Sequence, residues 1–201
     1  MKPKAQSSAI TIPEVKPEVI HLRIVGLSPL LTDRFGEDKI DVIERKQTGE
    51  HCSGRKPRNP TEEYESSKYR VKLGGKLVDC VPSMMFKGAM VQAAPYCDGL
   101  NMKLIKGAVF PIEEFTPLKF KLVRMHRSMG KNAGVSAGRI PRYRAEYVEW
   151  SCTLSLRFDP SALSKQNIAG LLNLAGTRIG IGNWRPQSGR SGGFHGMYRV
   201  S

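Results

Sequence analysis

The C-terminal segment of the chain holds the side chains best suited to bind a large anion. Six glycines lie between positions 180 and 196, among arginines and aromatic residues, and no acidic residue follows Asp159. Glycine lets backbone N–H groups approach a bulky anion, and the forked guanidinium of arginine matches phosphate oxygens. Residues 170–200 are therefore predicted to form a phosphate cradle with aromatic stacking partners. The candidate contacts are Arg178, Trp184, Arg185, Arg190 and Phe194.

The alternative for this segment is a flexible basic loop. A predicted helix over residues 164–176 precedes the glycines, and residues 194–200 after them are strand-like, so the segment between is expected to be ordered. Its glycines are Gly180, Gly182, Gly189, Gly192, Gly193 and Gly196.

A second basic segment, residues 124–144, has no acidic residue and no hydrophobic periodicity. Most charge runs are solvated faces, but six cations without a counter-charge exceed what solubility requires. Long structureless loops are commonly functional, so we predict a loop of about twenty residues that contacts phosphates. Tyr143 adds a stacking surface. The six cations are Arg124, Arg127, Lys131, Arg139, Arg142 and Arg144.

A third candidate lies at the start of a predicted helix over residues 83–94. Ser83 and Lys87 are four residues apart and therefore share a helix face near the N-terminus, where the helix dipole favours an anion. A capping serine beside a solvated lysine is an equally good interpretation of these two residues.

Candidates for catalysis are few. Asp33 follows the first predicted strand, but an aspartate beside an arginine is more often a turn or salt-bridge residue, and no paired carboxylates accompany it. General acid or base catalysis would need a positioned histidine with a partner, and the candidates His21, His126 and His195 are scattered along the chain.

Metal-ligand patterns are also weak. The four cysteines are far apart, with no C-x-x-C spacing, and only His51 beside Cys52 resembles half of a metal site. We therefore expect no metal site and no cofactor, and catalytic residues are expected to be absent.

The charge of the whole chain indicates its class of partner. The chain has 201 residues and a formal net charge of +14, which favours an anionic partner, nucleic acid before an anionic membrane surface. No stretch of eighteen apolar residues exists in the sequence, and the N-terminus has no hydrophobic signal region, so a cytoplasmic protein is expected.

Hydrophobic periodicity predicts the elements that must position these residues. Two helices, over residues 83–94 and 164–176, alternate with strands in an order that becomes βαββαβ-like once the insertions are set aside, which predicts an α+β fold. We expect a ferredoxin-like, RNA-recognition-motif-like antiparallel sheet backed by two helices. The strands are predicted over residues 18–25, 77–81, 107–112, 118–123, 147–158 and 194–200.

The remaining segments define the domain organisation. Residues 1–17 are polar and contain three prolines, which predicts a flexible arm. Residues 18–201 are expected to form a single domain with insertions at about 37–72 and 124–146. The first insertion should contain a short helix around residues 40–49 and another that begins with Asn59 as its N-cap and continues to Tyr69.

Three stretches, 21–31, 81–94 and 175–200, together resemble the RAMP superfamily, whose members form the repeated backbone subunits of CRISPR effector complexes. The resemblance implies that the loop after the first strand, the Ser83–Lys87 helix start and the glycine-rich loop hold single-stranded RNA. Residues 124–144 would then be a thumb or finger, and 37–72 an inserted helical lobe. In some such subunits an aspartate in the loop after the first strand cuts target RNA, and Asp33 lies in a comparable place. The chain resembles a minimal or phage-type relative.

The positive charge of the chain, its glycine-rich loop and its resemblance to the RAMP superfamily together predict a non-catalytic subunit. This subunit would bind single-stranded nucleic acid, preferably RNA, and form a homo-oligomer along the strand. Other effector-complex subunits are possible partners. Two alternatives stay open. One is a phage-type single-stranded DNA-binding or recombination accessory protein, since recognition of the 2′-OH depends on geometry. The other is a RAMP-type endoribonuclease.

Overall fold

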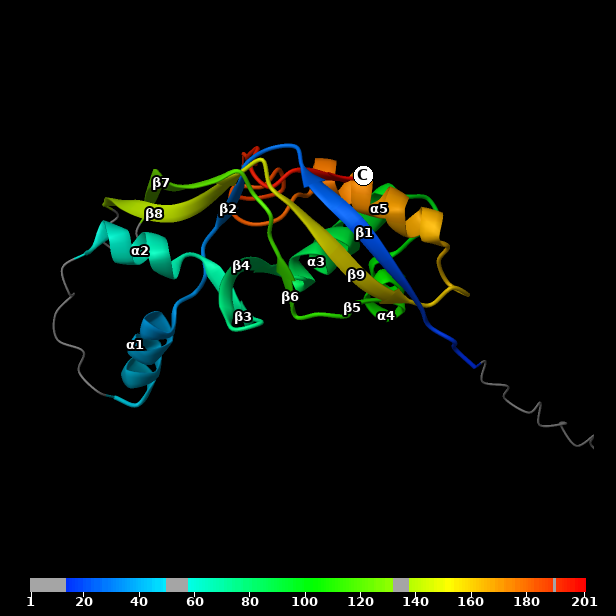
Figure 1. Cartoon of the computed structure of the whole chain (residues 1–201), viewed down its shortest axis with the longest axis horizontal. Helices are drawn as coiled ribbons and strands as arrows, with labels where there is room; N and C mark the ends of the chain where they lie inside the picture. Colours follow the sequence, from blue (N-terminus) through cyan, green and yellow to red (C-terminus); the bar gives the residue numbers. More distant parts are fainter. Residues whose placement is uncertain (1–13, 50–57, 132–137, 190) are drawn as a thin grey trace, which may run out of the picture.

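A four-stranded antiparallel sheet organises the computed structural model, which describes residues 14–49, 58–131, 138–189 and 191–201. The sheet order is β10, β1, β9, β5, and every neighbouring pair is antiparallel. Along the chain these strands follow the order β1, β5, β9, β10. Helix α3 lies between β1 and β5, and helix α5 lies between β9 and β10, which gives the order βαββαβ. Numbered along the chain, the four strands have the sheet order 4-1-3-2. This is the ferredoxin-like topology, so the predicted fold class is confirmed (Figure 1). The elements are β1 (Glu18–Gly26), α3 (Met84–Ala93), β5 (Val109–Pro111), β9 (Ser151–Phe158), α5 (Lys165–Arg178) and β10 (Tyr198–Val200).

Alternating apolar residues on the central strands build one face of the core. Strands β1 and β9 pair from Glu18 opposite Phe158 to Val25 opposite Ser151. Ile24 on β1 and Leu154 on β9 are fully buried, and period-two alternation places such residues on one side of a sheet. Helices α3 and α5 pack against each other and contribute Phe86 and Leu172 among others to this core. The ring of Phe86 meets that of Tyr198 edge-on, with centroids 5.4 Å apart.

Two smaller three-stranded sheets adjoin the main sheet. One has the order β2, β8, β7 and the other β3, β4, β6. Figure 1 places the β7–β8 hairpin and α2 at one end of the molecule and the main sheet with α3 and α5 at the other. The remaining elements are β2 (Leu30–Thr32), α1 (Glu37–Gln47), α2 (Pro60–Ser66), β3 (Tyr69–Leu73), β4 (Lys76–Pro82), η1 (Ala94–Tyr96), α4 (Met102–Ala108), β6 (Phe115–Pro117), β7 (Leu122–Lys131) and β8 (Arg139–Val148).

The prediction of a structureless loop over residues 124–144 is wrong. These residues form most of the hairpin β7–β8, paired from Leu122 opposite Val148 to Lys131 opposite Arg139. Much of the hairpin stands away from the core, so both of its faces carry polar side chains and the usual alternation of apolar and polar residues disappears. The absence of periodicity therefore indicated a solvent-exposed ribbon, not an absence of strands.

The predicted strand over residues 147–158 is divided into two. Glu149 has a φ of 51°, which lies in the left-handed region and breaks the extended backbone between β8 and β9. At the same bend the buried Trp150 donates its indole N–H to the carbonyl oxygen of Ser28 at 2.8 Å. The break transfers the chain from the hairpin sheet to the main sheet.

Several predicted boundaries also move. Asn59 caps α2 as predicted, but the helix ends at Ser66, and Tyr69 begins β3 instead of extending the helix. The predicted strand over 118–123 reduces to an isolated bridge at Lys119 before β7 begins. The last strand is restricted to β10, since the residues before it form turns.

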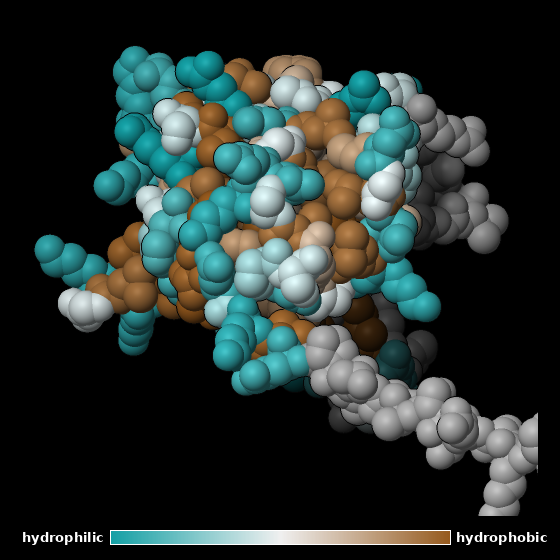
Figure 2. Space-filling model, turned by 90° about the vertical axis from the view of Figure 1, so that its right-hand side faces the viewer, coloured by the Kyte–Doolittle hydropathy of each residue, from teal (hydrophilic) through white to brown (hydrophobic). Residues whose placement is uncertain are grey.

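None of the helices in the described part of the chain is long and apolar enough to cross a membrane. Figure 2 views the end of the molecule formed by the main sheet and its helices, where hydrophobic residues are interspersed with hydrophilic ones.

Candidate nucleic-acid interface

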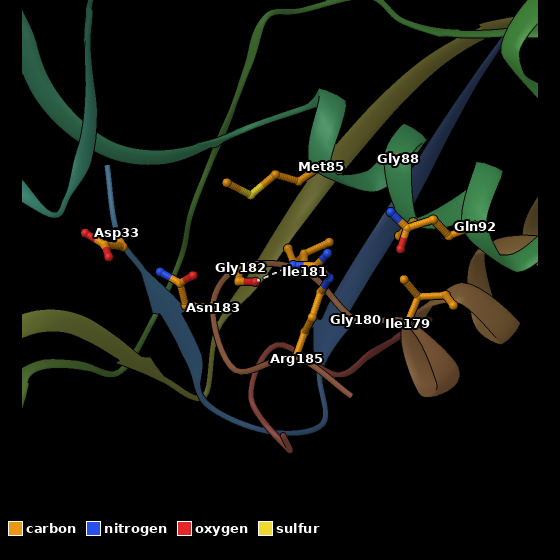
Figure 3. Close-up of a pocket in the computed structure, with 11 residues that line it drawn as sticks. Asp33, Met85, Gly88, Gln92, Ile179, Gly180, Ile181, Gly182, Asn183 and Arg185 are labelled. Atoms are coloured by element: carbon orange, nitrogen blue, oxygen red, sulfur yellow. Dashed lines mark hydrogen bonds between the residues drawn. The ribbon is translucent and has the colours of Figure 1, made fainter. Parts of the chain in front are cut away.

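A pocket of about 290 Å³ lies where the glycine-rich loop meets α3 and the segment that follows β2. These are the three segments that the sequence analysis grouped, and they come together although they are far apart in the chain. Figure 3 shows Met85, Gly88 and Gln92 from α3 on one side of the pocket and Asp33 with Asn183 on another. The lining is completed by Ala89, Ile179, Gly180, Ile181, Gly182 and Arg185.

The glycines of the loop serve close packing within the protein. A Cβ atom on Gly196 would lie 1.8 Å from the carbonyl oxygen of Ile181, and one on Gly193 would lie 2.0 Å from the carbonyl oxygen of Trp184. Gly182 would meet the Leu31 oxygen at 2.5 Å in the same way. The sequence pattern predicted that these glycines let an anion approach the backbone. At these three positions the structure shows another reason: a second segment of the chain packs against the glycine backbone.

The loop is also ordered by its own backbone hydrogen bonds, as predicted against the flexible alternative. The N–H of Asn183 donates to Leu31 and that of Gly196 to Pro29, each at 2.8 Å. Ile181 donates to Gly196 at 2.9 Å. Because these donors are already used, an anion at the loop would be bound mainly by side chains.

The loop arginines have different surroundings. Arg185 lines the pocket and donates from Nη1 to the carbonyl oxygen of Gly182 at 3.2 Å (Figure 3). Arg178, in the last turn of α5, is exposed and places its guanidinium 4.9 Å from the centroid of the Tyr96 ring. Arg190 lies outside the described residues.

The hairpin divides its cations between two faces. The cross-strand pairs of β7 and β8 place Arg124, Arg142 and Arg144 on one face, and Arg127 and Arg139 on the other. On the first face two arginines have acidic partners from outside the 124–144 segment. Arg124 pairs with Glu146, and Arg144 donates to Asp33 at 2.8 Å and is 11% exposed. The expectation of six cations without counter-charges is thus wrong for these two.

Three hairpin arginines keep their charge available. Within the described residues, no hydrogen bond or ion pair engages the side chains of Arg127, Arg139 or Arg142. Arg127 stands directly opposite Tyr143 in the strand register. The side chain of Lys131 lies outside the described part of the structure.

Two aromatic side chains of the glycine-rich loop are exposed next to the hairpin. Trp184 is 43% exposed and Phe194 is 63% exposed. The Trp184 ring lies edge-on to His126 of β7, with centroids 5.6 Å apart, so the loop and the hairpin are in contact. Phe194 stacks over His195 at 4.4 Å. Of the three unpaired arginines, only Arg142 shares the hairpin face of His126, and Arg127 and Arg139 lie on the opposite face. An exposed ring on the same side as an unpaired arginine forms a surface that can stack bases and bind phosphates.

Ser83 and Lys87 do not form an anion site. Ser83 is 1% exposed, and its hydroxyl bonds that of Thr116 at 2.7 Å without capping the helix. Lys87 is buried, donates from Nζ to the carbonyl oxygen of Lys106 and lies 3.7 Å from the centroid of the Phe110 ring. Burial lowers the pKa of its ammonium group. Both side chains are engaged inside the protein, so helix spacing alone misjudged their exposure.

The structure gathers a cluster that sequence reasoning missed. His126, Glu146 and His195 each offer a ligand atom within 4.8 Å of the others. His195 Nε2 lies 3.2 Å from Glu146 Oε1. Burial opposes ionisation of Glu146, but hydrogen bonds with Arg124 and His195 outweigh it and hold the pKa of this carboxyl below its usual value. Sequence separations of 20 and 49 residues carry no signal of such a cluster.

Other candidates from the sequence stay apart from this cluster. His21 lies on β1, where its Nδ1 is 3.0 Å from the Ser155 hydroxyl. His51 and Cys52 lie outside the described residues. Of the three histidines that the sequence analysis named as candidate acids or bases, only His126 and His195 lie together, with ring centroids 5.5 Å apart.

The topology and the site define an α+β protein of ferredoxin-like fold with a protruding basic hairpin beside a glycine-rich loop. In comparisons with known proteins, no family model matches the chain and no curated protein does. Among solved structures, the crystal structure of Cmr6 from Pyrococcus furiosus matches with a TM-score of 0.44 and 10% sequence identity. That match covers 92% of this chain and 98% of the other. Similarity at this level carries no conclusion about what this chain binds.

Proposed function

We propose that this protein is a non-catalytic subunit that binds single-stranded nucleic acid, with RNA as the preferred form. The observation that carries the proposal is the contact between the basic hairpin and the glycine-rich loop, which places the exposed Trp184 ring against the hairpin face that holds Arg142, an arginine without an acidic partner in the described residues. The proposal includes a relationship to the RAMP superfamily, supported by the order of elements and by the three segments that meet at the pocket.

Phosphate contacts are assigned to Arg127, Arg139 and Arg142, with Arg185 at the pocket. Their charges attract any strand through counterion release, which carries no sequence information. Arg124, Arg144, Ser83 and Lys87 are left out of the contact surface because each has a partner within the protein. Arg178 remains in it, since its guanidinium is exposed beside Tyr96.

Base contacts are assigned to Trp184 and Phe194. Stacking on a ring accepts any base, because every base has a π-face. The pocket of about 290 Å³ lies at the lower end of the usual size for small-ligand sites, so we infer that it receives one nucleotide-sized group. Met85 and Gln92 would face that group from α3.

Fluorescence anisotropy with end-labelled strands tests the proposal. The strands are RNA, DNA of the same sequence and the RNA duplex, at several salt concentrations. We expect tightest binding to single-stranded RNA and a steep loss of affinity with salt. Tighter binding to DNA would favour the phage-type DNA-binding alternative, and equal binding to the duplex would overturn the stacking role of Trp184. Sequencing the nucleic acid that co-purifies with the protein adds an independent measurement.

Assembly along the strand is part of the proposal. A surface of this size contacts roughly four to eight nucleotides, by analogy with other single-strand-binding folds, so one copy binds weakly and neighbours must contribute. Candidate contact surfaces are the arm 1–17 and α1, which exposes Ile40, Val42 and Ile43. A repeated head-to-tail contact that does not close forms an open filament.

Mass photometry on RNA of increasing length tests the assembly. The mass per complex should rise in steps, and removal of residues 1–17 should lower cooperativity more than the affinity of a single copy. A constant one-to-one complex on a strand of about sixty nucleotides would overturn the filament while leaving single-copy binding intact.

RNA cleavage is the second candidate, since His126 and His195 lie side by side with Glu146. However, His195 is 2% exposed and cannot reach a substrate without rearrangement. Asp33, the other candidate, is bound by Arg144. We therefore expect intact RNA after incubation with and without divalent metal. Cleavage that disappears in the Asp33→Ala or His126→Asn variant would establish the enzyme instead.

A further inference from the structure

We propose that His126, Glu146 and His195 hold one divalent transition-metal ion of the Zn²⁺ class, which ties the β7–β8 hairpin to the glycine-rich loop. His126 lies on β7, Glu146 on β8 and His195 in the loop before β10. One ligand atom from each lies within 4.8 Å of the other two.

The cluster contains buried polar atoms that lack hydrogen-bond partners in the described structure. Glu146 is 4% exposed and His195 2% exposed, so water has little access to either. The Nδ1 atoms of His126 and His195 are both buried without a hydrogen-bond partner in the described structure. Buried polar atoms are normally satisfied, and each orphaned one destabilises the fold. A bound ion takes one lone pair from each imidazole and one from the carboxylate, and so provides a partner for one ring nitrogen of each histidine.

The donor types select the ion. Imidazole nitrogen suits Zn²⁺, Co²⁺ and Ni²⁺, whereas Mg²⁺ and Ca²⁺ prefer all-oxygen sites. A histidine binds a metal through the lone pair of a neutral imidazole, so formation of the site requires both rings in that form. Two imidazoles and one carboxylate leave the fourth position of a tetrahedral site to water, which can enter only on the side of His126, the one partly exposed member of the cluster.

The required movement is small. Ligands at about 2.1 Å around a tetrahedral ion are about 3.4 Å apart, so atoms at most 4.8 Å apart need shifts on the order of 1 Å. Arg124 binds the second carboxylate oxygen of Glu146 and leaves the first directed at His195, which is the orientation that a supporting hydrogen bond gives to a ligand.

Nearby charges set the balance for a dication. Arg124 and Arg144 both face His126 and oppose a further positive charge. Glu146 and Asp33 offset them, since each carboxylate is paired with one of these arginines. The burial of His195 excludes substrate contact, so the ion is assigned a structural role and not a catalytic one.

Titration of the untagged, chelator-treated full-length protein with Zn²⁺ and with Co²⁺ tests the site. Calorimetry should give one ion per chain, and Co²⁺ should develop the visible absorption bands of a tetrahedral site. Co²⁺ should also quench Trp184 fluorescence, because its ring centroid lies 5.6 and 6.1 Å from those of the two histidines. The Trp184→Phe variant should lose the quenching and retain the ion.

Variants assign the ligands. Glu146→Gln and His126→Asn should each weaken Zn²⁺ binding by at least about tenfold, since even a supporting residue of a metal site contributes that much. His21→Asn is the matched control, because this exposed histidine lies on β1 outside the cluster. Circular dichroism shows whether each variant folds. If Glu146→Gln does not fold, the Zn²⁺ affinity of His126→Asn alone tests the ligand assignment.

The results that would overturn the proposal are distinct from one another. A protein that binds no stoichiometric Zn²⁺ has no such site. Affinity unchanged in both Glu146→Gln and His126→Asn would exclude these ligands. Binding that is lost in Cys52→Ser and retained in Glu146→Gln would place the ion at the His51–Cys52 pair instead.

Discussion

Replacement of Gly196 by alanine tests the inferred role of the glycine-rich loop most directly. Gly196 has a φ of 66°, and a Cβ atom there would lie 1.8 Å from the carbonyl oxygen of Ile181. Gly189 is the matched control: its φ is 61°, but a Cβ atom would meet nothing within 4 Å. Both substitutions introduce the same backbone strain, so any difference between them measures the close contact.

The magnitudes can be worked out for each site. A non-glycine residue in the left-handed region costs about 1–2 kcal/mol, and reduced freedom of the unfolded chain returns about 0.4–1 kcal/mol. Gly189→Ala should therefore lower the free energy of unfolding by about 1 kcal/mol. At Gly196 the chain must also move apart, which adds about 1–3 kcal/mol of strain. Weakening of the hydrogen bonds that link Gly196 to Ile181 and Pro29 adds about 1 kcal/mol.

Urea unfolding followed by circular dichroism measures the difference. We expect Gly196→Ala to be less stable than Gly189→Ala by at least about 2 kcal/mol, which at a slope of about 2 kcal/mol/M moves the midpoint by about 1 M. Equal losses in the two variants would refute the packing role. If Gly189→Ala instead lost RNA affinity without losing stability, the original interpretation, approach of a phosphate to the backbone, would be restored at that position.

Three further predictions concern the surface beside the loop. Alanine at Arg127, Arg139 and Arg142 together should weaken binding to every sequence alike and reduce the slope of log affinity against log salt by about 2, as measured by anisotropy, with unfolding unchanged. Trp184→Ala should weaken single-strand binding by about 5- to 150-fold, corresponding to about 1–3 kcal/mol per stacked base, while Trp184→Phe retains most of it; equal affinities would exclude stacking. Burial lowers the pKa of His126 in the folded protein, so as the pH falls the unfolded chain binds a proton at this histidine before the folded chain does. The contribution of His126 to the free energy of unfolding should therefore be constant above about pH 6.5 and decline below it. Urea midpoints across this range should decline less in His126→Asn, and an identical decline would assign the acid sensitivity elsewhere.

The order of elements was readable in the sequence because local patterns produce it. Alternation in β1 and β9 and the apolar spacing of α3 and α5 reflect burial on one side of each element. Those patterns predicted the βαββαβ order and hence the main sheet. The hairpin lacked such a pattern, since its two faces have no common core, and the bend at Glu149 depends on one residue in the left-handed region.

The candidate site was predictable only in part. The exposed rings of Trp184 and Phe194 and the arginines of the hairpin could be selected by type, because charge and aromatic character belong to single residues. Whether these arginines are unpaired could not be predicted, because the acidic partners lie in other parts of the fold: Glu146 of β8 pairs with Arg124, and Asp33 after β2 pairs with Arg144. The prediction of an anion site at Ser83 and Lys87 was wrong for the same reason. The sequence indicates where a helix begins, but it does not indicate whether that end of the helix faces solvent.

The sequence by itself determined the fold class, the excess of positive charge and the presence of a glycine-rich segment. Each follows from residue type and spacing along the chain. Tertiary structure alone decided what those glycines contact, which arginines remain free, and that His126, Glu146 and His195 meet. These depend on distances between segments that are far apart in the chain, and such distances are fixed by the packing of the sheets and not by any local pattern.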